Sequence, residues 1–153
     1  MSDAPNNHTA SPFTTEFAVR YAELDPQNVV FNSRYLEYSD VVISEYWRAL
    51  GLSGPDAPDL QFHIRHAGVD FLAPLRGGDV VRGTAQIARL GNSSLTIRVT
   101  LREARDDAAA APRATIDLTM VHVDLASGRP TPVPDHARKA FGNELARQQD
   151  ISA

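Results

Sequence analysis

The chain has 153 residues, 42% of them hydrophobic and 22% charged, which is typical of a globular domain with its own core. Its formal net charge of −4 comes without a basic block, which argues against nucleic acid as a partner, because phosphate binding needs clustered lysine and arginine. The sequence has no cysteine, which excludes disulfides, thiolate nucleophiles and cysteine metal sites.

The first twelve residues are polar, and they predict a disordered tail and not a secretion signal. No run of about 18 apolar residues follows, so no membrane-spanning segment and no membrane partner are predicted. We therefore expect a cytoplasmic protein with a tail at residues 1–12 and a single domain at residues 13–148.

A strand is predicted over residues 13–21, where Phe13, Phe17 and Val19 alternate with polar neighbours. The next segment, Asp25-Pro26-Gln27-Asn28, predicts a turn, because Asp-Pro and Asn favour turn conformations.

The segment from Asn32 to Leu50 predicts a helix that is apolar on nearly all sides. Its polar residues recur at steps of three and four and form one narrow stripe: Glu37, Asp40, Ser44 and Arg48. A surface helix has a narrower apolar face, so we expect this helix to be largely enclosed. A side-chain oxygen of Asn32 or Ser33 is expected to cap its start, and Gly51 is expected to end it.

Four strands and a second helix are predicted after this helix. The strands are expected at residues 61–73, 80–90, 95–102 and 114–123, and the helix at 134–148. Gly68 is a candidate for a β-bulge, and short turns at Gly77-Gly78 and Gly91-Asn92 imply antiparallel neighbours. This order of strands and helices predicts an α+β fold in which a five-stranded antiparallel sheet wraps around the helix of residues 33–50.

Four segments, in this order, resemble the 4-hydroxybenzoyl-CoA thioesterase family, whose members have the hotdog fold. In that family an aspartate after the first strand is followed seven residues later by the start of the central helix, and an aromatic residue comes three residues after that. Here Asp25, Asn32 and Tyr35 have this spacing. The three later segments that resemble family motifs are VDFLAPLRGGD at residues 69–79, GNSS at 91–94, and residues 123–134. Two differences stand out: family members often have Gly at the position of Asn28, and many have His near Val29 or Asn32.

The resemblance implies hydrolysis of an acyl-CoA or aroyl-CoA thioester, without a cofactor. Asp25 would act as general base or as nucleophile, and the residues do not separate these roles. The backbone N–H groups of Asn32 and Ser33, at the positive end of the helix dipole, would stabilise the oxyanion. The resemblance also implies a homodimer with continuous sheets, often paired into a homotetramer, whose sites combine Asp25 of one subunit with a pocket formed partly by the other.

Several further residues are candidates for substrate binding. Arginines bind phosphate well, and glycines allow close backbone approach to a ligand. The candidates are Asn28, Val30, Phe31, Tyr35, His66, Arg76, Gly77 and Arg89. Glu23 has two interpretations, a second carboxylate in the site or an exposed charge at a strand end, and we expect the second. Glu37 and Asp40 are expected to face solvent or a second subunit.

His63 and His66 form a His-x-x-His pattern on a predicted strand. Residues three apart on a regular strand point to opposite faces, so we expect no metal site there. The sequence also lacks a Gly-x-Ser-x-Gly elbow, a Walker loop and a Gly-x-Gly-x-x-Gly motif. Two alternatives stay open: a thioesterase that acts on acyl carrier protein, and a non-catalytic acyl-binding protein on the same fold.

Overall fold

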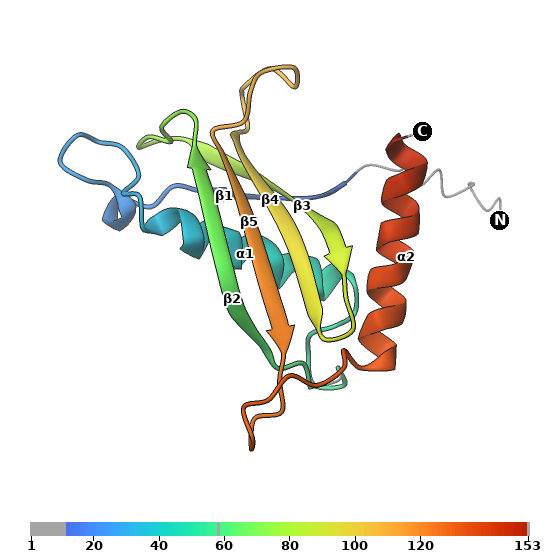
Figure 1. The fold of residues 1–153 in the computed structure, drawn as a ribbon. Coiled ribbons are helices and arrows are strands. Elements are labelled where there is room, and N and C mark those ends of the chain that lie inside the picture. The colour runs from blue at the N-terminus through green and yellow to red at the C-terminus, as the bar shows by residue number, and fades with distance from the viewer. Residues whose placement is uncertain (1–11, 58, 153) are drawn as a thin grey trace.

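The computed structural model describes residues 12–57 and 59–152. The α-helices and strands in this part of the chain are β1 (Phe13–Ala18), α1 (Arg34–Ala49), β2 (Phe62–Phe71), β3 (Val80–Leu90), β4 (Ser94–Glu103), β5 (Ala114–His122) and α2 (Asp135–Ser152). All five strands form one antiparallel sheet in the order β1-β3-β4-β5-β2, with α1 lying across one face (Figure 1). The α+β hotdog architecture is therefore confirmed. The predicted tail lies almost entirely outside the described residues, and the division into tail and single domain stays a prediction.

The core lies between α1 and the inner face of the sheet. On β4, Leu95, Ile97, Val99 and Leu101 are fully buried, whereas the residues between them face outward, as the alternating pattern predicts. From the helix, Tyr38, Val42 and Tyr46 fill the space opposite. The helix approaches β3 so closely that a side-chain carbon at Gly83 would collide with Val42 Cγ2. Neither helix in the described part of the chain has the length and apolarity needed to cross a membrane.

The helix α1 is buried on one face only, so the expectation of an enclosed helix is wrong for the single chain. Leu36 and Val41 are 43% and 42% exposed, because the sheet covers only one side of the helix. The polar stripe that contains Glu37 and Asp40 is exposed, as expected. The predicted side-chain cap is also wrong, because Ser33 already has helical backbone angles and its side chain makes no capping hydrogen bond.

Two features of the strands differ from the sequence prediction. The first strand ends at Ala18, and a 3-10 turn follows at Tyr21–Glu23. The bulge in β2 lies at Arg65 and not at Gly68, because the register against β5 shifts between Ile64 and His66.

His122 is a buried polar residue without a hydrogen-bond partner. It is 7% exposed and its ring packs edge-on against Phe62, with ring centres 5.2 Å apart. Neither of its ring nitrogens has a partner among the described residues. Burying polar atoms without a hydrogen bond costs stability, so this side chain is a weak point of the core.

We predict that His122→Leu raises the free energy of unfolding by about 1 kcal/mol, because an apolar side chain of similar size removes the unpaired nitrogens. For a chain of this length the corresponding rise in Tm is about 2–4 °C, measurable by thermal denaturation. His63→Leu is the matched control, since His63 is exposed, and it should leave Tm nearly unchanged. A His122→Leu protein less stable than the wild type would contradict the prediction.

Candidate active site

The loop between β1 and α1 folds back on itself and brings Asp25 beside the start of the helix. Leu24 and Val30 form an isolated β-bridge. The N–H of Asp25 donates to the carbonyl oxygen of Val29 at 2.9 Å, and the N–H of Phe31 donates to that of Glu23 at 2.9 Å. Residues 23–25 therefore run antiparallel to residues 29–31, which lead directly into α1.

The carboxylate of Asp25 is half-buried, and one of its oxygens is used within the loop. Oδ1 accepts hydrogen bonds from the N–H groups of Gln27 at 2.8 Å and Val29 at 3.3 Å. Among the described residues, Oδ2 accepts no hydrogen bond and forms no ion pair. The side chain thus performs the turn-forming role of an aspartate before proline, while its second oxygen remains available to a ligand.

Asn28 occupies a backbone conformation that explains one difference from the resembled family. Its φ is +62°, in the left-handed region that glycine and, less often, asparagine adopt. The loop packs closely against Gly77 here: a side-chain carbon at Gly77 would lie only 2.6 Å from Asn28 Oδ1. Asparagine in place of glycine therefore preserves the turn.

The N-terminus of α1 presents unpaired backbone donors. The N–H of Arg34 donates to the carbonyl oxygen of Phe31 at 2.9 Å, and the N–H of Tyr35 donates to the carbonyl oxygen of Asn32 at 3.3 Å. Within the described chain, the N–H groups of Asn32 and Ser33 have no partner, and both residues are exposed. Since Ser33 does not cap the helix, these donors stand free at the positive end of the helix dipole, where a developing negative charge is stabilised.

A small cavity of about 290 Å³ opens at this helix end. It is lined by Val30, Asn32, Tyr35 and residues 71–74. Tyr35 is held in place because its hydroxyl accepts a 3.2 Å hydrogen bond from the N–H of Leu75 and its ring packs edge-on against Phe71. Neither Asp25 nor Ser33 is a lining residue, so in the single chain the cavity touches Asn32 at the helix start but not the Asp25 carboxylate.

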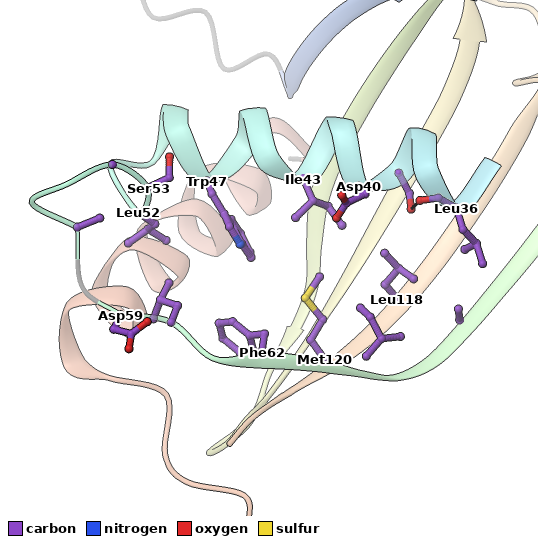
Figure 2. Close-up of a pocket in the computed structure, with 16 residues that line it drawn as sticks. Leu36, Asp40, Ile43, Trp47, Leu52, Ser53, Asp59, Phe62, Leu118 and Met120 are labelled. Atoms are coloured by element: carbon purple, nitrogen blue, oxygen red, sulfur yellow. Dashed lines mark hydrogen bonds between the residues drawn. The ribbon is translucent and has the colours of Figure 1, made fainter. Parts of the chain in front are cut away.

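A larger pocket of about 620 Å³ lies between α1 and β2. Leu36, Asp40, Ile43 and Trp47 project from one side of the helix toward Phe62 and Met120 on the strands (Figure 2). On the helix, the lining begins at Leu36, in the first turn of α1. Apolar side chains make up most of its lining residues, and Ser39, Asp40, Ser53 and Asp59 add polar groups to its wall.

The structure gathers most of the predicted substrate-binding residues at the loop. Arg76 forms an isolated β-bridge with Val29, and the N–H of Gly77 donates to the carbonyl oxygen of Asn28 at 3.3 Å. The N–H of Val30 likewise donates to the carbonyl oxygen of Leu75 at 2.8 Å. Phe31 directly precedes the two residues with free amides, and its side chain is 50% exposed.

Two predicted residues lie elsewhere in the single chain. Arg89 is near the far end of the eleven-residue strand β3, roughly 30 Å from the turn that carries Arg76 at the strand rise of about 3.3 Å per residue. His66 pairs with Thr119, whose neighbours Leu118 and Met120 face the helix. His66 therefore faces the outer side of the sheet, away from this loop.

The bulge at Arg65 also corrects the argument about the two histidines. His63 pairs with Val121 and His66 with Thr119, so the extra residue places both side chains on the same outer face. The premise that they point to opposite faces was wrong. The described residues still contain no group of three or more ligands suited to a metal ion.

Glu23 is the residue whose environment the sequence reasoning missed. It was expected to be exposed, but it is only 3% exposed. Although burial raises the pKa of its carboxyl group, hydrogen bonds from Arg20 and Tyr38 hold that pKa below its ordinary value. The sequence gives no clear signal of this burial: Glu23 accepts from the N–H of Arg20 as the acidic residue of a capping box does, but an arginine cannot return the second hydrogen bond of that motif.

Comparison with known proteins gives a family match and several structural matches. A family model described as "thioesterase superfamily" matches residues 27–110, beginning two residues after Asp25. No curated protein matched the sequence.

Many solved structures share the fold, including the three that follow. A 1,4-dihydroxy-2-naphthoyl-CoA thioesterase from Synechocystis has 21% identity and a TM-score of 0.75, covering 87% of this chain and 97% of its own. A predicted thioesterase from Bacillus stearothermophilus has 24% identity and a TM-score of 0.73, covering 88% and 96%. A thioesterase from Thermus thermophilus, solved in complex with coenzyme A and Zn, has 25% identity and a TM-score of 0.68, covering 84% and 95%.

Proposed function

The chain belongs to the thioesterase superfamily, and from that membership we propose that it hydrolyses acyl-CoA or aroyl-CoA thioesters to the free acid and coenzyme A. One observation carries the proposal: a carboxylate with a free oxygen lies on the loop that leads directly to unpaired amides at the start of α1. The similarity to one enzyme acting on an acyl-CoA and to another that binds coenzyme A supports the CoA donor.

In the proposed reaction the thioester carbonyl oxygen accepts a hydrogen bond from the N–H of Asn32, with the N–H of Ser33 beside it. Asp25 takes a proton from water while that water attacks the carbonyl carbon. The carbon–sulfur bond then breaks, and coenzyme A leaves as a thiolate that recovers the proton. In the alternative route, Asp25 attacks the carbonyl carbon itself and expels coenzyme A as the thiolate. Water then hydrolyses the mixed anhydride, which releases the acid, restores the Asp25 carboxylate and supplies the proton that the thiolate takes up.

Substrate binding follows from the two cavities. We propose that the acyl group enters the larger pocket beside α1, where it would lie against apolar side chains such as Leu36, Ile43 and Trp47. Arg76, held beside the loop by its bridge to Val29, would bind a phosphate of coenzyme A. The acyl carrier protein alternative would use the same site with a different thiol donor.

The test is a panel of acyl-CoA and aroyl-CoA thioesters, with a thiol reagent that reports release of coenzyme A. Turnover of at least one of them is expected. If the acyl carrier protein thioester is turned over much faster than the matching acyl-CoA, the first alternative is correct. Thermal stabilisation by acyl-CoA without any turnover identifies the non-catalytic binding protein.

We further propose that two copies pair through β2. Among the described residues, this strand lies at the edge of the sheet and is hydrogen-bonded only to β5. On this strand or directly after it, the apolar side chains of Ile64, Phe71 and Leu72 are each 55% exposed. An unpaired apolar edge is a template for pairing with another strand, and a second copy would also cover the exposed side of α1 and complete the site.

The prediction for this interface is that the wild type is a dimer or tetramer and that Ile64→Lys shifts it toward the monomer. A lysine on an edge strand opposes pairing because its charge must stay in water. Leu125→Lys is the control, since Leu125 is 62% exposed and lies outside β2. Light scattering after size-exclusion chromatography measures the mass. A monomeric wild type, or an Ile64→Lys protein of unchanged oligomeric mass, would rule out this interface.

A further inference from the structure

We propose that Glu23 is a positioning residue that holds the Asp25 loop in register with the N-terminus of α1, a role that rests on the proposed function. Glu23 touches neither cavity. It acts through the segments that it joins, two residues before Asp25.

The Glu23 carboxylate connects the end of β1 to the helix. Its Oε1 accepts hydrogen bonds from the N–H of Arg20 at 2.7 Å and the hydroxyl of Tyr38 at 2.9 Å. Its Oε2 accepts from Arg20 Nε at 3.2 Å and Nη2 at 3.0 Å. Its backbone carbonyl accepts from the N–H of Phe31 at 2.9 Å. Glu23 thus joins three segments: Arg20 before the loop, Tyr38 in the second turn of α1, and Phe31 just before the free amides.

The helix end of this connection is rigid. Tyr38 is 2% exposed, and its ring packs edge-on against Phe17 with ring centres 5.1 Å apart. Its hydroxyl therefore cannot move to another partner without disturbing the core. Removing the carboxylate would leave this hydroxyl buried and unpaired, and would leave only backbone hydrogen bonds between residues 23–25 and 29–31 to hold the loop beside α1. Because the proposed chemistry acts across the gap between Asp25 and Asn32, a shift of about 1 Å there is enough to lower turnover strongly.

The protein contains a second cluster with the same chemistry at a different place. Glu144 on α2 is 9% exposed and accepts hydrogen bonds from the hydroxyl of Tyr46 at 2.6 Å and from Arg147 Nε at 2.9 Å. Tyr46 lies on α1 about two turns beyond Tyr38. Both clusters join a buried glutamate to a helix tyrosine and to an arginine three residues away, but only the Glu23 cluster adjoins Asp25.

The experiment compares Glu23→Ala, Glu23→Gln and Tyr38→Phe with Glu144→Ala, Glu144→Gln and Tyr46→Phe. Thermal stability, kcat, KM and amide hydrogen exchange are measured for each protein. Glu23→Ala is expected to lower kcat by about 100-fold, with KM changed less than about threefold, because misplacement affects the transition state more than binding. Glu23→Gln should recover part of this loss, since the amide oxygen still accepts from Tyr38. The Glu144 and Tyr46 variants should lose comparable Tm and keep wild-type kcat.

Hydrogen exchange provides the readout that does not depend on activity. In Glu23→Ala and Tyr38→Phe, the amides of residues 24–33 should exchange faster, while in the Glu144 and Tyr46 variants they should not. Unchanged exchange in residues 24–33 overturns the positioning role, whether or not the wild type hydrolyses a thioester. Faster exchange in the Glu23 variants together with a wild-type kcat also overturns it. So does a loss of kcat that parallels the loss of Tm in the variants of both clusters. An inactive wild type with faster exchange in the Glu23 variants contradicts the proposed function alone.

Discussion

Replacing Asp25 with asparagine is expected to lower kcat for a CoA thioester by about 10²–10⁴-fold, the range for loss of a general base. The fold should survive, because the asparagine Oδ1 still accepts the hydrogen bonds that Gln27 and Val29 donate to Asp25. The substitution removes the negative charge and the proton acceptor while retaining the shape of the turn. The loss should therefore appear in turnover and not in Tm.

Asp124 offers a matched control for this substitution. Its Oδ1 also accepts a backbone hydrogen bond within a turn, from the N–H of Ser127 at 2.8 Å. Asp124→Asn should keep wild-type kcat. Release of coenzyme A, followed with a thiol reagent, measures both variants. An Asp25→Asn protein with wild-type turnover would show that Asp25 only forms the turn.

The second large effect is expected from removing one backbone donor at the start of α1. Asn32→Pro eliminates the N–H that we propose to face the thioester oxygen, and loss of one such donor typically lowers kcat by about 10²–10³-fold. Proline is tolerated at the start of a helix, where the N–H has no partner within the helix. Asn32→Ala, which keeps the N–H, should retain most of the activity.

Ser33 allows the two neighbouring donors to be compared. Its φ of −67° already suits proline, so Ser33→Pro should fold normally. We expect Asn32→Pro to lose more turnover than Ser33→Pro. Steady-state kcat and circular dichroism on the three variants provide the measurement, and a folded Asn32→Pro protein with wild-type kcat would remove the helix amides from the mechanism.

Much of the fold follows from local patterns in the sequence. The strand predicted at residues 80–90 has the observed bounds Val80–Leu90, and the central helix was placed within one residue of Arg34–Ala49. Alternation along residues 95–101 correctly separated the buried and outward faces of β4. These features depend on neighbours two to four residues apart, which the sequence displays directly.

The features that were missed depend on contacts between distant segments. The bulge at Arg65 is defined by the register of β2 against β5, and no glycine marks it. The burial of Glu23 requires Tyr38, fifteen residues away, to reach back from the helix. How much of α1 is covered depends on the curvature of the sheet and, in our proposal, on a second copy. The spacing of Asp25, Asn32 and Tyr35 is visible in the sequence. The left-handed conformation of Asn28, which lets this loop close, is not.

The most direct measurement of the proposed site is a crystal structure of the protein with an acyl-CoA analogue whose thioester sulfur is replaced by a methylene group. We predict that the ketone oxygen of the bound analogue lies about 2.7–3.1 Å from the backbone nitrogen of Asn32, with the free carboxylate oxygen of Asp25 on the other side of the carbonyl carbon. An analogue bound with its carbonyl away from the start of α1, or with the Asp25 side chain turned into solvent, would contradict it.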